Sequence, residues 1–364
     1  MIQLSDSIIS ETILNIDRAL KANINFFAFR MPGLKSEIHF GASDRLIEGL
    51  AENAFVIGSF DNSAIFSIPA DYTSLENVNL HGNCFIDDSE TPDSTTRDAH
   101  RHEVETIRTH LAAEGGKVVA ARALTIQGCI SVGKSFAALC HAYPTAFVSC
   151  FCSSRSGLWI GASPETLLRL HNDRIETMAL AGTRPRTNDP ATPHPFNFSA
   201  PAWDYKNIEE QQLVVDFICR TMLDNDLKPQ SSWRFTRTVG PVEHNCTRIT
   251  ADATPLHNSP THLRRLLTSL SPTPAVCGSD RTISMELISR LESFPRTFYG
   301  GFMGLMRHIN DFDLFVNLRC CRIFSSAFTL YAGGGITPLS SPDDEWDETE
   351  RKLSTLMSKL IYLS

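Results

Sequence analysis

The chain has 364 residues, of which 42% are hydrophobic and 20% charged, and its formal net charge at pH 7 is −8. This balance is typical of a soluble globular protein, and the negative charge argues against nucleic-acid binding driven by phosphate neutralisation. No apolar run reaches the roughly 18 residues of a membrane span. The N-terminus lacks the basic and apolar regions of a signal peptide, so we expect a cytoplasmic protein without a membrane partner.

The first 95 residues alternate helical and strand-like patterns and carry no recognisable chemistry. Residues 7–20 have the amphipathic period of a helix. Three later runs are rich in phenylalanine, valine and isoleucine and read as strands, at residues 25–30, 54–60 and 63–69.

The next segment contains two candidate catalytic residues, a lysine and a glutamate. A helix predicted over residues 102–113 is stopped by Gly115 and Gly116, and a buried strand then begins at Lys117. A strand-end lysine is most often a solvated residue, so this position alone decides nothing. A strand pair over residues 145–161 leads into a turn that carries Glu165.

Residues 128–135, GCISVGKS, satisfy the pattern of a phosphate-binding P-loop. This motif raises a nucleotide-binding enzyme as an alternative. The loop carries isoleucine and valine where small residues usually cradle phosphate, and no later strand ends in an obvious metal-binding aspartate, so we do not favour it.

The second half of the chain places further polar residues at the ends of predicted elements. A strong amphipathic helix over residues 206–223 holds Glu210 in its first turn, and a strand over residues 236–242 leads to His244. Helices are predicted over residues 260–270 and 282–292, the first capped by Ser259. A strand over residues 313–324 has Arg319 in its middle, which is costly without an anionic partner.

Near the C-terminus, a predicted strand runs into Gly333, Gly334 and Gly335, and an acidic helix follows over residues 343–360. Consecutive glycines let backbone N–H groups converge on an anion. Glu345 and Glu348 share one helix face with Lys352. The combination suits an anionic ligand held through a divalent metal such as Mg²⁺. The alternative is an ordinary glycine turn before a helix whose acidic first turn complements the macrodipole.

Many strands at hairpin spacing, interrupted by a few helices, predict an α+β fold with large antiparallel β-sheets flanked by helices. From about residue 100 to the end, several motifs occur in a specific order: KVVAAR, GASPE, LAGTRPR, PTPAVCG, AGGGI and PDDEWDE. In this order they resemble the chorismate-utilising enzymes, namely the anthranilate, aminodeoxychorismate, isochorismate and salicylate synthases. The resemblance implies the chorismate-binding fold, with residues 96–364 as the catalytic domain and residues 1–95 as a variable part of the same fold.

The resemblance also implies roles for individual residues. Lys117 would be the general base that activates water, and Glu165 the general acid that protonates the leaving hydroxyl. Mg²⁺ would be the cofactor, and its ligands would be Glu210, Glu345 and Glu348. Chorismate would be bound by the following residues: Gly182, Thr183, His244, Ala275, Tyr299, Arg319, Gly333, Gly334, Gly335 and Lys352.

A few positions separate the branches of this family. The aminodeoxychorismate branch carries a nucleophilic lysine where this chain has Ala181, and a lysine at position 117 marks the enzymes that use water. No glutaminase segment is present, so we expect the protein to act on chorismate without a glutaminase subunit. The resemblance to the single-domain synthases of the family implies a monomer. We therefore predict an isochorismate synthase, with salicylate synthase as the alternative, and an apolar wall made by Ala275, Val276 and Phe294.

The chain departs from the family pattern at positions outside the proposed catalytic pair. These departures are Gln211, Ser271, Gly334 and Asp343. A homologue that binds without catalysing would be expected to have lost Lys117 or Glu165, and both are present.

Overall fold

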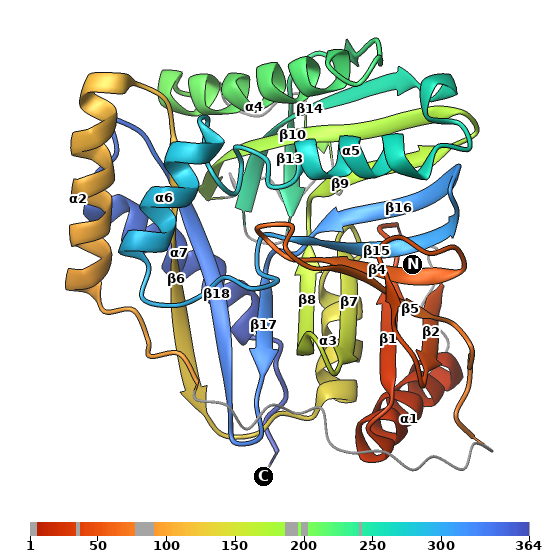
Figure 1. Cartoon of the computed structure of the whole chain (residues 1–364). Helices are drawn as coiled ribbons and strands as arrows, with labels where there is room; N and C mark the ends of the chain where they lie inside the picture. Colours follow the sequence, from red (N-terminus) through yellow and green to blue (C-terminus); the bar gives the residue numbers. More distant parts are fainter. Residues whose placement is uncertain are drawn as a thin grey trace.

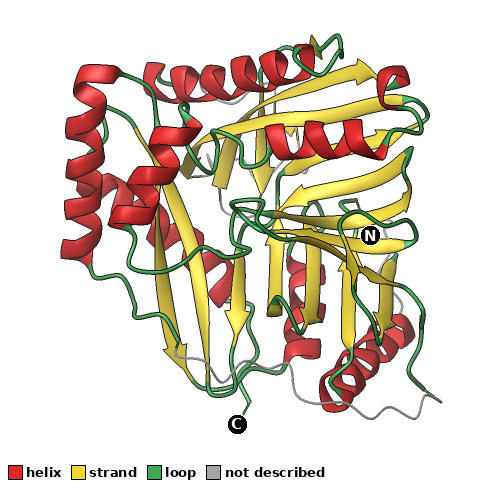
Figure 2. Cartoon of the chain, in the orientation of Figure 1, coloured by secondary structure: helices red, strands yellow, loops and turns green. Residues whose placement is uncertain are grey.

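The computed structural model describes residues 6–33, 37–76, 91–185, 196–197, 203–239 and 242–363. Figure 1 shows two large sheets whose strands run across one another, with helices on their outer faces. Figure 2 shows how strands fill the centre and helices the periphery. The predicted α+β fold with large antiparallel sheets is confirmed. Within the described ranges, no helix is both long and apolar enough to span a membrane.

The first sheet has seven strands, all antiparallel to their neighbours. Its strands in spatial order are β2 (Ile38–Ser43), β1 (Asn25–Arg30), β7 (Phe147–Ser153), β8 (Gly157–Ser163), β17 (Cys320–Ile323), β18 (Ala327–Ile336) and β6 (Val118–Gln127). β7 and β8 are buried along their whole length, because the sheet is covered on both faces.

The second sheet has eleven strands among the described residues. Its main path is β11 (Phe196–Asn197), β13 (Phe235–Val239), β14 (Val242–Asp252), β10 (Arg174–Pro185), β9 (Thr166–His171), β16 (Asp311–Val316), β15 (Phe302–His308), β4 (Ala54–Gly58), β5 (Ile65–Pro69) and β3 (Ile47–Glu48), with β12 (Gln230–Ser231) beside β14.

Four of the described helices begin at a side chain that caps one of their first backbone N–H groups. Thr96, Asp204, Ser259 and Asp280 each accept a hydrogen bond from the residue three positions on, so the predicted cap at Ser259 is confirmed. The helices are α1 (Asp6–Ala22), α2 (Arg97–Glu114), α3 (Val132–Ala142), α4 (Tyr205–Leu223), α5 (Pro260–Leu270), α6 (Arg281–Leu291) and α7 (Pro342–Met357), with a 3₁₀ turn at Thr254–Leu256.

Aromatic side chains join the two sheets. Phe147 of β7 stacks on Phe315 of β16 with ring centroids 4.0 Å apart, and Phe27 of β1 stacks on Phe55 of β4 at 4.9 Å. The first 95 residues therefore supply strands to both sheets and share their core. A functional boundary at residue 95 stays a prediction.

The prediction of one strand over residues 313–324 is wrong. The chain leaves the second sheet after Val316 and enters the first sheet at Cys320. Arg319 lies in the link between them and has a φ of 48°, in the left-handed region. The apolar run carries no glycine or proline to announce this break, which depends on the packing of two sheets.

The three glycines do not form an anion-binding turn. Gly333, Gly334 and Gly335 lie inside β18 and pair with Ala121, Ala120 and Val119 of β6. None of the three has a positive φ, so the predicted convergence of their N–H groups is wrong. These positions are glycines because of the side chains that pack against them in the candidate site.

The P-loop alternative also loses its structural basis. α3 begins at Val132, within the motif, and the Ser131 N–H that precedes it donates to the carbonyl of Ile361. A Cβ on Gly133 would lie 3.0 Å from Cγ2 of Ile13, because α1 packs on α3 here. The motif is a packed helix start instead of a phosphate cradle.

Candidate active site

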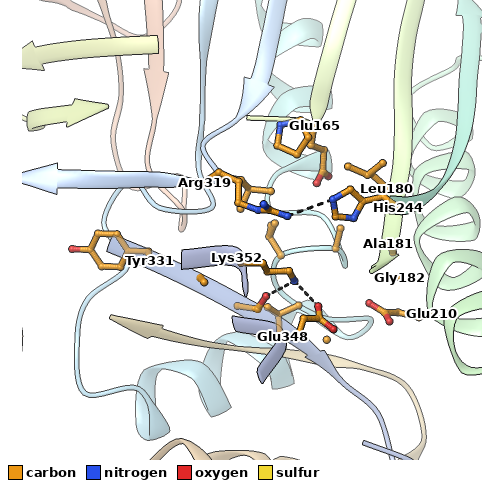
Figure 3. A pocket seen from close by; sticks show the side chains of 18 of the residues that line it. Glu165, Leu180, Ala181, Gly182, Glu210, His244, Arg319, Tyr331, Glu348 and Lys352 are labelled. Carbon is orange, nitrogen blue, oxygen red and sulfur yellow. Dashed lines mark hydrogen bonds and ion pairs between the residues drawn. The ribbon is translucent and has the colours of Figure 1, made fainter. Parts of the chain in front are cut away.

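A cavity opens between the two sheets and α7, as Figure 3 shows. Its space, open solvent included, is about 650 Å³. Most of the predicted site residues line it: Glu165, Gly182, Glu210, His244, Ala275, Tyr299, Arg319, Gly333, Gly335, Glu348 and Lys352. They come from distant parts of the chain, and the fold gathers them in one place.

Four predicted residues do not line this cavity. Lys117, Gly334 and Glu345 are not part of its lining. Lys117 contacts the lining residue Glu210, Gly334 lies between the lining residues Gly333 and Gly335, and Glu345 feels the charge of the lining residue Glu348. The side chain of Thr183 is outside the described part of the structure, although its backbone in β10 pairs with His244 of β14. Arg186, in the same sequence motif, is also outside it.

Lys117 is held at the start of β6 by two contacts. Its ammonium Nζ lies 2.8 Å from Oε1 of Glu210, and its backbone N–H donates to Oγ of Ser279 at 2.9 Å. The side chain is 1% exposed. Lys117 therefore reaches the cavity only past the carboxylate of Glu210.

Glu165 occupies the turn between β8 and β9, and its backbone is fixed on both sides. Its N–H donates to Oγ of Ser163 at 3.3 Å, and its carbonyl accepts from the N–H of Val316 at 3.0 Å. Burial raises the pKa of Glu165 to about 8, against the opposing charges of Lys117, Arg237 and Lys352. A carboxyl with this pKa keeps its proton at neutral pH and can act as an acid.

Arg319 and His244 form a pair on one side of the cavity (Figure 3). Nη2 of Arg319 donates to Nε2 of His244 at 3.4 Å. Burial and the positive charge of Arg319 lower the pKa of His244 well below its usual value, so the imidazole is neutral. In the described structure Arg319 makes no ion pair with a carboxylate, which leaves its guanidinium available for an anionic ligand.

The three predicted metal ligands are each paired with a lysine. The contacts are Glu210 with Lys117 at 2.8 Å, Glu345 with Lys206 at 2.8 Å, and Glu348 with Lys352 at 2.6 Å. Burial and the nearby charge of Glu348 raise the pKa of Glu345, so these carboxylates lie close enough to repel each other.

This donor set fits a hard cation such as Mg²⁺, which prefers carboxylate oxygens. The described side chains do not already form a cluster of three or more metal-binding groups. Each of the three carboxylates is instead ion-paired with a lysine, so a bound cation would have to compete with the lysines for these oxygens.

The glycines of β18 give the acidic side chains room. A Cβ on Gly335 would lie 2.5 Å from both Oε1 of Glu210 and Cε of Lys117. A Cβ on Gly334 would lie 2.7 Å from Oε2 of Glu345. The close approach of these side chains to the strand, and not a turn conformation, explains the glycine run.

We expect Gly335→Ala to lower kcat by about 10²-fold, because it pushes apart the Lys117–Glu210 pair by a distance of the order of 1 Å. The fold should survive, since the backbone at this position is an ordinary strand. Gly334→Ala is the comparison variant. Its Cβ would meet Oε2 of Glu345 but not the Lys117–Glu210 pair, so we expect a smaller loss than for Gly335→Ala. Equal rates for both variants and the unmodified protein would contradict this explanation.

Some lining residues were not predicted. Leu180 and Leu318 form apolar parts of the wall, and their sequence patterns are those of ordinary core residues. Ala275 and Val276 line the cavity as expected, but Phe294 does not. Phe294 instead packs against Tyr331 at a centroid distance of 5.6 Å, in the aromatic core.

The chain matches one protein-family model and is similar in sequence to several isochorismate synthases. A family model described as chorismate binding enzyme matches residues 73–361. Isochorismate synthase MenF of Escherichia coli is 30% identical over 273 residues, covering 70% of this chain and 58% of that protein. Isochorismate synthase EntC of E. coli is 31% identical over 204 residues, covering 56% and 51%. The chain thus spans about half the length of the curated relatives it matches.

The solved structure of MenF, the menaquinone-specific isochorismate synthase from E. coli, has the same fold. It aligns with a TM-score of 0.73 at 20% identity and covers 92% of this chain and 88% of that one. The family match extends over most of the chain and includes the whole cavity described above. The chain belongs to the chorismate-binding enzyme family.

Proposed function

We propose that this protein is an isochorismate synthase that interconverts chorismate and isochorismate. Water adds at C2 of the ring, and the hydroxyl at C4 leaves. Relatives with this name support the proposal. The observation that carries it is Glu165, a buried carboxyl in the cavity wall whose raised pKa keeps it protonated.

Glu165 supplies the proton that the C4 hydroxyl needs in order to leave as water. Hydroxide is a poor leaving group, and a positioned acid overcomes this barrier. The neutral His244 and the cationic Arg319 lie in the same cavity as Glu165. They orient polar groups of the substrate without competing for the proton.

Lys117 is the proposed base for the attacking water. The contact with Glu210 holds it in position, and Lys117 accepts the proton of water only after its own ammonium proton has been lost. Glu210, Glu345 and Glu348 are the residues that would hold Mg²⁺, which would neutralise the ring carboxylate of the substrate and orient it.

The substrate is a dianion, and the cavity offers matching cations. Arg319 has no carboxylate partner among the described side chains, whereas Lys352 is ion-paired with Glu348 at 2.6 Å and donates to the carbonyl of Gly333 at 2.8 Å. A guanidinium suits bidentate binding of a carboxylate. Ala181 lines the cavity where a nucleophilic lysine would be needed for amination at C4, which favours water as the nucleophile.

The only product expected from chorismate is isochorismate, in equilibrium with the remaining chorismate and without release of pyruvate. The reaction only moves a hydroxyl around a diene, so either isomer should give the same final mixture. A lactate dehydrogenase assay for pyruvate should stay silent with the purified protein and respond after an isochorismatase or a lyase is added. Stoichiometric pyruvate with salicylate fluorescence would instead show salicylate synthase, the alternative function.

A further inference from the structure

A second cavity shares strands β10 and β14 with the first one. Its space, open solvent included, is about 800 Å³. Four strands contribute the polar residues Thr166, Arg169, Glu176, Arg237 and Arg248 to its lining, and Thr145 adds to them from the chain before β7. Alternate residues of a strand share a face, so His244 in the first cavity and Arg248 in the second are on one side of β14.

Arg237 lies at the border of the two cavities. It is the cross-strand neighbour of His244 in the pairing of β13 with β14. Its guanidinium donates to Sδ of Met178 at 2.9 Å and to the carbonyl of Thr145 at 3.3 Å. It makes no ion pair with a described carboxylate.

This environment is unfavourable for a positive charge. Burial lowers the pKa of Arg237, and thioether sulfur is a weak acceptor. Arg237 is partly buried, and a guanidinium withdrawn from water is unfavourable without a counterion. Arg237 therefore lacks the anion that would normally accompany it.

The other charged groups of the second cavity leave an excess of positive charge. Arg248 is only loosely paired with Glu176, at 3.7 Å, and its side chain is 49% exposed. Arg169 contacts Asp313, which is outside the lining. Three arginines thus face one glutamate across the cavity.

We propose that the second cavity binds one small oxyanion, a phosphate or carboxylate group, through Arg237, with Arg169 and Arg248 at its sides. The planar fork of an arginine matches such groups and can bind them with two hydrogen bonds. This site is separate from the proposed substrate site and does not depend on the proposed reaction.

An anion bound to Arg237 would raise the pKa of Glu165. Arg237 is one of the three cations, with Lys117 and Lys352, that lower the pKa of Glu165. An anion on Arg237 would offset its field, so phosphate should extend the activity of the unmodified enzyme to higher pH. This consequence, unlike the binding itself, rests on the proposed function.

The test is calorimetric titration of the purified protein at low ionic strength, with inorganic phosphate in one arm and malonate in the other. The substrate cavity can also attract anions, so the decisive comparison is between Arg237→Gln and Arg319→Gln. We expect saturable binding to weaken about tenfold or more in Arg237→Gln and to persist in Arg319→Gln. The relative affinities in the two arms distinguish a phosphate site from a carboxylate site.

Two further variants serve as controls for the titration, one for the loss of charge and one for the folding of Arg237→Gln. Arg220→Gln, on the exposed face of α4, removes the same charge outside the cavity and should bind as the unmodified protein does. Arg248→Gln alters a half-exposed residue at the cavity, so it should fold even if Arg237→Gln does not, and bind severalfold more weakly.

Several outcomes would overturn the proposal. They are the absence of saturable binding of either anion, unchanged binding in Arg237→Gln and Arg248→Gln, or loss of binding in Arg319→Gln alone. If neither anion binds while Arg237→Gln shifts the pH dependence of activity, Arg237 serves only to tune Glu165, and no anion site exists.

Discussion

Glu165→Gln is expected to lower kcat for isochorismate formation by about 10²–10⁴-fold, the usual contribution of a positioned acid. Glutamine has nearly the same shape but no proton to give to the leaving hydroxyl. The pKa of Glu165, about 8, sets a second expectation. The acid form is present below this pH and is lost as pH rises through it, so the forward rate of the unmodified enzyme should fall above about pH 8.

Glu165→Gln should have lost this fall in rate at alkaline pH along with most of its activity.

Lys117→Ala should lower kcat by a similar factor, about 10²–10⁴-fold, if the lysine is the base. Glu286→Gln, on the exposed face of α6, is the control and should leave both rate and pH profile unchanged. A near-normal rate for Lys117→Ala would make that residue a structural partner of Glu210 and nothing more.

Removal of divalent metal is expected to abolish the activity, and added Mg²⁺ to restore it. The reason is the set of Glu210, Glu345 and Glu348, whose oxygen donors suit this ion. Burial, together with the charge of Glu348, raises the pKa of Glu345. Glu348→Gln should behave as the chelated enzyme does, with a loss of about 10²-fold or more. Asp347→Asn, exposed on the same helix, is the matched control.

Thermal unfolding gives a readout that does not depend on turnover. Mg²⁺ should raise the melting temperature of the unmodified protein and of Asp347→Asn, because a ligand that binds only the folded state stabilises it. Glu348→Gln should show a smaller rise. Full activity in EDTA would remove the metal from the mechanism, whatever the melting curves show.

The sequence allowed the fold class and most helices to be predicted, because these depend on local periodicity and capping. The helix at residues 260–270 and its cap at Ser259 are found where expected. The break at Arg319 could not be predicted, since the run from Phe312 to Phe324 has strand-forming apolar residues on both sides of it and no glycine or proline. Only the packing of two sheets decides where such a chain changes partner.

The candidate site was predictable in its membership but not in its arrangement. Ordered motifs identified the residues, and most of them line one cavity. Spacing along the chain could not show that Lys117 lies behind Glu210, or that each acidic residue pairs with a lysine. Those contacts join residues far apart in sequence, such as Lys206 and Glu345. Arg237 carried no motif and gave no signal at all.

The glycine strand has a consequence for the thermodynamics of binding. Gly333 and Gly335 make part of the cavity wall from backbone alone, held along β6 by a continuous ladder of paired residues. A wall without side chains has no rotamers to lose when a ligand settles against it. The entropic cost of ordering the protein therefore falls on the few long side chains that face this strand, such as Arg319 and Lys352. Both are already restrained by hydrogen bonds, so most of that cost is met when the chain folds.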